Sequence, residues 1–177
     1  IRDSSNVSNH SFSETVYFDV IRKKTAALFA ACTEAAAYSV GVSEEEVKLA
    51  RLLGEYIGIC FQIKDDIFDY FDSKEIGKPT GNDMLEGKLT LPVLYALNRA
   101  NDNQAAEIAL KVKEGTATLA EIARLIAFTK ENGGIEYAVR TMNAYKQKAF
   151  GLLASLPDSA ICVALRSYLD YVVDREK

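Results

Sequence analysis

Three carboxylates stand within five residues of the segment FQIKDDIFDY, residues 61–70, which is otherwise largely apolar. On a helix, Gln62, Asp65 and Asp69 have the spacing i, i+3, i+7 and therefore share one face. Asp66 lies beside that face. Like charges four residues apart repel, so a helix gains nothing from this arrangement unless something neutralises it. Oxygen-only ligands of this kind suit Mg²⁺ or Mn²⁺.

Several lysines surround this acidic segment in the sequence. Lys24 lies in the stretch KKTA, and Lys78 and Lys88 flank a glycine-rich stretch directly after the acidic helix. Mg²⁺ commonly completes its coordination shell with substrate phosphate, and a diphosphate needs further positive charge. Taken singly, each feature is ordinary, since DxxxD arises by chance and Lys24 alone is typical of a surface lysine. Together they predict a metal-dependent diphosphate site.

The elements that must position these residues are predicted to be helices throughout, and the fold class is all-α. Only three prolines and ten glycines interrupt the chain. Ser13 is the expected N-cap of a helix that runs to about Tyr38 and ends at Gly41. The next helix, 43–71, should be central and buried, and the pair Ser43 and Glu46 forms its capping box.

A breaker-rich stretch, 72–88, follows the acidic helix and is expected to be a functional or disordered loop. Thr90 and Pro92 mark the start of a further helix that extends to about Arg99. The remaining helices are predicted at 103–113, 118–131, 134–154 and 159–174. We expect one domain over residues 1–177, with residues 1–12 forming a disordered arm or a truncated end.

Composition narrows the class of function. The net charge of −4 argues against a nucleic-acid partner, which usually needs a basic face. No apolar run approaches the roughly 20 residues of a membrane span, and the polar start shows no cleavable signal. Cys32, Cys60 and Cys162 are expected to be buried free thiols, which together with these features predicts a cytoplasmic protein. A single histidine and the lack of a CxxC pair argue against zinc.

Longer stretches of the sequence resemble a known family. GICFQIKDDIFDYF followed by GKPTGNDMLEGKLTLPVLYAL resembles the second aspartate-rich motif of the trans-isoprenyl (polyprenyl) diphosphate synthases. The upstream IRKKTAALFAAC is similar to that family's lysine–threonine motif, and GGIEYAVRTMNAYKQKAFGLLASLPDS is similar to its terminal helices. The likeness covers most of residues 14–175. The EGKLTLP form is most similar to the octaprenyl-type, longer-chain branch.

The resemblance implies the C-terminal part of the isoprenoid-synthase helical bundle around an apolar cavity. It implies a prenyltransferase in which an allylic diphosphate ionises and isopentenyl diphosphate attacks the cation, with Mg²⁺ gripping the leaving diphosphate. The implied metal ligands are Asp65, Asp66 and Asp69. The implied diphosphate ligands are Lys24, Gln62, Lys78 and Lys88, and Lys24, Thr25 and Gln62 carry the implied catalytic roles.

The chain departs from that family in one respect. It contains neither the first DDxxD motif nor the basic isopentenyl-binding residues, so it resembles only the C-terminal half of such a synthase. We therefore expect this piece to be inactive or weak alone, and to form a homodimer or associate with the missing N-terminal half. The alternatives are a non-catalytic partner subunit of a prenyl diphosphate synthase, a class I terpene cyclase or a generic helical interaction module.

Overall fold

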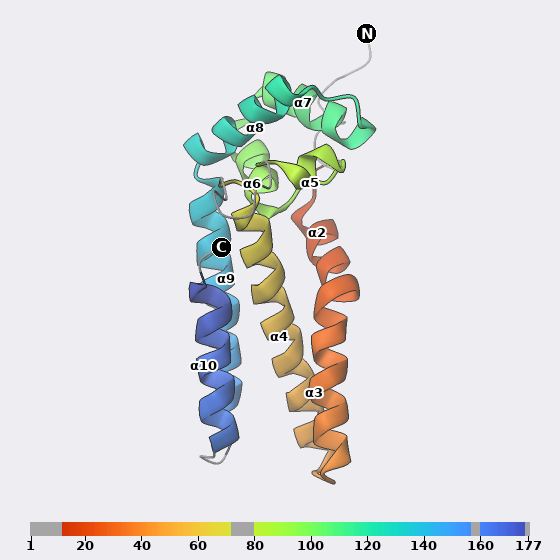
Figure 1. Cartoon of the computed structure of the whole chain (residues 1–177), viewed down its shortest axis with the longest axis vertical. Helices are drawn as coiled ribbons and strands as arrows, with labels where there is room; N and C mark the ends of the chain where they lie inside the picture. Colours follow the sequence, from red (N-terminus) through yellow and green to blue (C-terminus); the bar gives the residue numbers. More distant parts are fainter. Residues whose placement is uncertain (1–11, 72–79, 157–159, 176–177) are drawn as a thin grey trace. The chain divides into compact units, whose positions relative to one another are not determined.

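The structure, a computed structural model, describes residues 12–71, 80–156 and 160–175 (Figure 1), and every regular element in these ranges is a helix. This confirms the all-α prediction. The helices are α2 (Glu14–Ile21), the π-helical η2 (Arg22–Ala26), α3 (Ala27–Ser39), α4 (Glu44–Phe68), α5 (Asn82–Leu85), α6 (Leu91–Ala100), α7 (Asn103–Glu114), α8 (Leu119–Glu131), α9 (Gly134–Ala154) and α10 (Ala160–Asp174). No helix in the described ranges has the length and apolar character needed to cross a bilayer.

The chain divides into two compact units, and α4 and α9 each contribute to both. Unit 1 combines residues up to 17 with residues 66–138, and unit 2 combines residues 18–65 with residues 139–177. The sequence-based expectation of one domain over residues 1–177 stays a prediction.

In unit 1, α8 packs against both α6 and α7, and α5 contacts α7. Its helix ends carry the signals that the sequence contains. Asp102 caps α7 by accepting hydrogen bonds from two backbone amides, and Thr118 and Glu121 form a reciprocal capping box at the start of α8. Phe12, at the end of the predicted polar arm, is buried, and the Asn98 side chain donates to its carbonyl.

Unit 2 is built around α4. Its glycines allow α3 and the π-helical turn η2 to approach closely. A Cβ atom on Gly54 would lie 2.5 Å from the Phe29 carbonyl oxygen, and one on Gly58 would lie 2.6 Å from Ala26 Cα. On another side of α4, the buried Cys60 thiol donates to the Met142 carbonyl of α9. Close packing of α3 and η2 against these two glycines therefore fixes the position of α4 within this unit.

Several sequence predictions are confirmed at the level of single hydrogen bonds. Ser13 Oγ accepts from the Val16 amide at the start of α2. The Ser43 amide donates to the Glu46 carboxylate while the Glu46 amide donates to Ser43 Oγ, which is the predicted capping box. The buried core of α4 between Ile57 and Ile67 also agrees with the expected central helix.

Other predictions need correction. The helix expected over 13–38 contains the π-helical turn η2. In such a turn the backbone hydrogen bonds span five residues instead of the four of an α-helix. Helix α4 ends at Phe68, not near 71, because Tyr70 and Phe71 donate to carbonyls only three residues back. The expected loop 72–88 contains the short helix α5 among its described residues. Cys32 was predicted to be buried, but it is exposed. Helix α3 packs against α4 through its other side, where Ala30 lies close to Gly54.

Candidate functional site

Within unit 2, the π-helical turn carries two of the predicted site residues. Thr25 Oγ1 donates a 2.7 Å hydrogen bond to Gln62 Oε1 of α4, and both side chains are partly buried. Lys24 is exposed, and no carboxylate in the described ranges forms an ion pair with it. Single π-helical turns inside α-helices are frequent at functional sites. The turn therefore carries an exposed cation and, next to it in sequence, a hydroxyl that is hydrogen-bonded to the Gln62 amide of α4.

Asp65 is the accessible carboxylate of the acidic segment. Its side chain is 45 % exposed and forms an ion pair with Arg175, whose side chain is only 16 % exposed. Arg175 also lies over the Phe61 ring, with its guanidinium carbon 4.2 Å from the ring centre. All three residues belong to unit 2. The Asp65 carboxylate is thus accessible to solvent, and it already forms an ion pair with a cationic side chain.

Asp66, the next residue, has the opposite environment within unit 1. It is 2 % exposed, and Oδ2 accepts a 2.5 Å hydrogen bond from the Tyr17 hydroxyl. Burial and the neighbouring Asp66 raise the pKa of Tyr17 well above its ordinary value, so the phenol stays a donor. The Tyr17 hydroxyl supplies the hydrogen bond that a buried carboxylate requires.

Asp69 anchors the start of α5, also in unit 1. Its two carboxylate oxygens accept from the backbone amides of Asn82 and Asp83, each at 3.0 Å. Gly81 just before them has a φ of +80°, and a Cβ there would lie 2.8 Å from Ile122. The left-handed conformation and the close approach both require glycine at this position. Asp69 therefore links the end of the acidic segment to α5, the short helix that precedes Lys88.

The predicted lysines differ in what the structure describes. Lys88 in unit 1 is exposed, and its Nζ lies 2.5 Å from the Glu86 carboxylate. That hydrogen bond raises the pKa of Lys88, so its ammonium group stays charged. Lys78 lies outside the described residues.

The carboxylate oxygens of the acidic segment are the kind of ligand that Mg²⁺ binds. Mg²⁺ needs oxygen ligands and takes one or two protein carboxylates together with water and phosphate oxygens. Asp65 offers such a carboxylate to solvent. Asp69 uses each oxygen once for a backbone amide, and a carboxylate oxygen can accept more than one interaction. Within the described part of the chain, no group of three or more histidine, cysteine or acidic side chains converges on one point.

Sequence reasoning missed two residues, Tyr17 and Arg175. Tyr17 lies 49 residues from Asp66 in the chain, and no local pattern predicts their hydrogen bond. Arg175 lies 110 residues from Asp65 in the chain, and no local pattern predicts their ion pair.

Comparison with known proteins identifies the class. Residues 1–129 match the family described as Polyprenyl synthetase. The sequence is 36% identical over 176 residues to octaprenyl diphosphate synthase of Haemophilus influenzae, covering 99% of this chain and 53% of that protein. The chain therefore belongs to the polyprenyl synthetase family, and it spans about half the length of the curated relatives it matches.

Solved structures agree with this assignment. The chain superposes on geranylgeranyl pyrophosphate synthase from Bacteroides thetaiotaomicron with a TM-score of 0.90 and 80% identity, covering 97% of this chain and 57% of that one. It also superposes on a polyprenyl synthase from Caulobacter crescentus CB15 in complex with calcium and isoprenyl diphosphate, with a TM-score of 0.84 and 33% identity, covering 97% of this chain and 53% of that one. The helical fold is thus that of polyprenyl synthases.

Proposed function

We propose that this chain carries a metal- and diphosphate-binding part of a trans-prenyltransferase. The proposed reaction joins an allylic diphosphate to isopentenyl diphosphate and gives a longer polyprenyl diphosphate. The observation that supports it most is the Thr25–Gln62 hydrogen bond in unit 2, beside the accessible charges of Lys24 and Asp65, in a member of this family.

The proposed roles follow from charge and accessibility. Asp65 and Asp69 are the proposed ligands of Mg²⁺, Asp66 supports them from the same acidic segment, and Mn²⁺ has compatible chemistry. The proposed diphosphate ligands are Lys24, Gln62, Lys78 and Lys88. Because Asp66 is buried against Tyr17, its proposed part is to fix the segment, while Asp65 offers its oxygens to the ion.

The chemistry of the leaving group explains why such residues are needed. When the allylic C–O bond breaks, negative charge builds on the departing diphosphate. Lysines fixed where that charge appears stabilise the transition state more than the ground state. Bound Mg²⁺ would supply further positive charge to the same oxygens. Thr25 and Gln62 would hold their dipoles in a fixed orientation near the developing cation, because each restrains the other.

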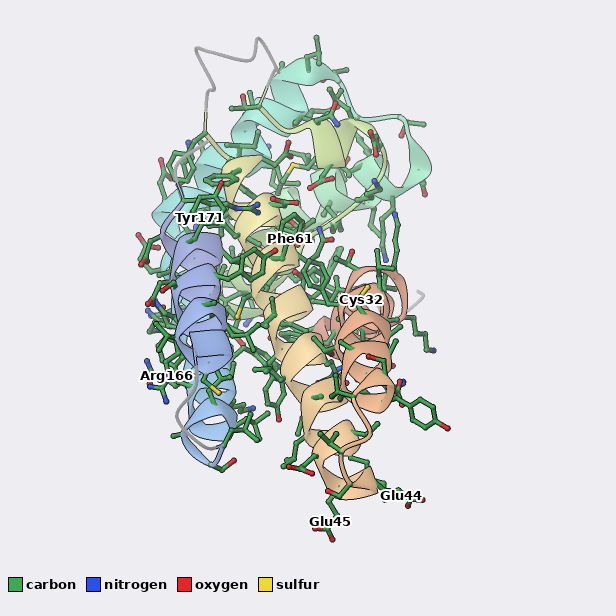
Figure 2. All side chains as sticks on the ribbon, turned by 60° about the horizontal axis from the view of Figure 1, so that its bottom comes forward. Cys32, Glu44, Glu45, Phe61, Arg166 and Tyr171 are labelled. Atoms are coloured by element: carbon green, nitrogen blue, oxygen red, sulfur yellow. The ribbon has the colours of Figure 1, made fainter. Side chains whose placement is uncertain are left out.

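Calorimetric titration of the chain with inorganic pyrophosphate in the presence of Mg²⁺ tests the proposal. We expect binding that disappears with a chelator, weakens about tenfold or more in Asp65→Ala, and weakens in Lys24→Gln. Glu45→Ala is the matched control, because Glu45 is an exposed acid at the opposite end of the same helix (Figure 2). Equal affinities of Asp65→Ala and Glu45→Ala would reject the assignment.

We further propose that turnover requires residues beyond this chain, since its curated relatives are about twice as long. Exposed apolar side chains in unit 2, including Val20, Leu28 and Val163, are consistent with association, either as a homodimer or with such residues. The test is a product assay with an allylic diphosphate, isopentenyl diphosphate and Mg²⁺. Robust product from these 177 residues alone would disprove the requirement.

A further inference from the structure

Arg175 is held by three separate interactions in unit 2. Its guanidinium forms the ion pair with Asp65, lies over the Phe61 ring and donates a 3.4 Å hydrogen bond to the Phe61 carbonyl. The Arg175 amide also donates to the Tyr171 carbonyl at 2.8 Å, which continues the last turn of α10. Figure 2 shows Phe61 on α4 and Tyr171 on the last turns of α10. The contact is therefore anchored by aromatic stacking and by backbone hydrogen bonds.

A divalent ion and Arg175 require the same carboxylate. Two cations close to one carboxylate repel each other, and the repulsion increases as the site loses water. Mg²⁺ also demands near-octahedral ligand positions, which restricts how the carboxylate is shared. Arg175 therefore neutralises Asp65 in the absence of metal, and a metal ion at Asp65 would compete with the guanidinium for the carboxylate.

We propose that Arg175 is a latch on Asp65 that competes with the divalent ion. The inference rests on the proposed function, because it takes Asp65 as a metal ligand. Its consequence is that the metal affinity of Asp65 depends on the C-terminal end of α10. Occupation of the site by metal releases that end, and docking of that end lowers metal affinity.

Mn²⁺ binding measured by electron paramagnetic resonance, with no diphosphate present, tests the latch. We expect Arg175→Gln to bind Mn²⁺ about fivefold more tightly than the unmodified chain, because the competing cation is gone. Arg166→Gln is the matched control, since Arg166 is an exposed arginine on the same helix (Figure 2) and loses the same charge. We expect less than about a twofold change there. The double variant Asp65→Ala/Arg175→Gln should have the same Mn²⁺ affinity as Asp65→Ala alone.

The outcomes separate this inference from the proposed function. Unchanged or weaker Mn²⁺ binding by Arg175→Gln, with binding still lost in Asp65→Ala, would overturn the latch and leave the metal site intact. Failure of both the unmodified chain and Arg175→Gln to bind Mn²⁺ would overturn both. An effect of equal size in Arg166→Gln would mean that net charge alone is responsible, which also overturns the latch.

Trypsin provides a second readout that does not measure affinity. Trypsin cleaves after arginine. Because the Arg175 guanidinium is paired with Asp65, cleavage after Arg175, which removes the two residues that follow it, should be slow. We expect Mn²⁺ to accelerate that loss, followed by mass spectrometry, and Asp65→Ala to be cleaved rapidly with or without metal. A cleavage rate that is the same with and without Mn²⁺ in the unmodified chain would contradict the latch.

Discussion

Asp65 and Asp66 are neighbours in the sequence, yet their carboxylates have opposite environments. In unit 2, the Asp65 side chain is 45 % exposed and is neutralised by the guanidinium of Arg175. In unit 1, Asp66 is 2 % exposed and accepts a hydrogen bond from Tyr17. The partner of Asp65 is a charged side chain, whereas the partner of Asp66 is a buried phenol.

The difference teaches that an acidic motif does not assign one role to all its members. A buried carboxylate is costly to desolvate and must be satisfied by fixed donors, so it contributes to the fold. An ion pair whose carboxylate is accessible to solvent, as that of Asp65 is, contributes less to stability than a fully buried one. We infer that Asp66 fixes the acidic segment and that Asp65 exchanges Arg175 for a ligand.

The largest expected effect comes from removing the buried member of the pair. Asp66→Ala should destabilise the fold by about 3 kcal/mol, because it removes the buried carboxylate that accepts from the Tyr17 hydroxyl and creates a cavity. Asp65→Ala should cost about 1 kcal/mol or less. Urea unfolding followed by circular dichroism measures both. Equal losses for the two variants would break the comparison.

A smaller effect tests whether close packing of α4 against η2 holds the site residues of unit 2 in place. Gly58→Ala should destabilise the fold by about 2 kcal/mol, because the new methyl would lie 2.6 Å from Ala26 Cα and force α4 and η2 apart. Gly151→Ala is the matched control, since a Cβ there meets nothing within 4 Å. The control should be stabilised by about 0.5–1 kcal/mol, as expected for alanine in a helix. Thermal unfolding distinguishes the two, and a tolerated Gly58→Ala would contradict the packing account.

The smallest effect concerns another acid of unit 1 with a structural role. The hydrogen bond from Lys111, followed by that from the Thr118 amide, lowers the pKa of Glu121 from 4.5 to about 2. The folded state therefore favours the charged form. Its contribution to stability is complete above pH 4.5 and is lost as the pH falls toward 2. Glu121→Gln should lower the Tm at pH 7 and leave it nearly unchanged near the pKa of the folded state.

Glu131→Gln, at the exposed end of the same helix, is the control for Glu121. Its Tm should follow that of the unmodified chain at both pH values. If the deficit of Glu121→Gln persisted undiminished at low pH, the carboxylate charge would not be its cause. The structural role assigned to acids of unit 1 would then need a different explanation.

Local signals predicted most of the helices and part of the site. Apolar periodicity defines α4, and Ser43 with Glu46 defines its start. Only the family resemblance implied that Thr25 and Gln62 act at one site, and in the structure Thr25 donates a hydrogen bond to Gln62. The π-helical turn η2 was not predictable, because its sequence RKKTA is compatible with an ordinary helix.

The different environments of Asp65 and Asp66 could not be predicted, because their partners are distant in sequence. Tyr17 lies 49 residues from Asp66, and Arg175 lies 110 residues from Asp65. Helical spacing separates the two carboxylates by about 100° around α4 but does not determine which one a neighbouring element covers. That assignment depends on tertiary packing, which only the structure provides.

The most direct test of the central claim is a crystal structure of the chain with Mn²⁺ and inorganic pyrophosphate, with anomalous diffraction recorded near the manganese edge. We expect an anomalous peak within coordination distance of an Asp65 carboxylate oxygen, with pyrophosphate oxygens completing the shell and the guanidinium of Arg175 displaced. Manganese bound elsewhere, with Asp65 still paired to Arg175, would contradict it.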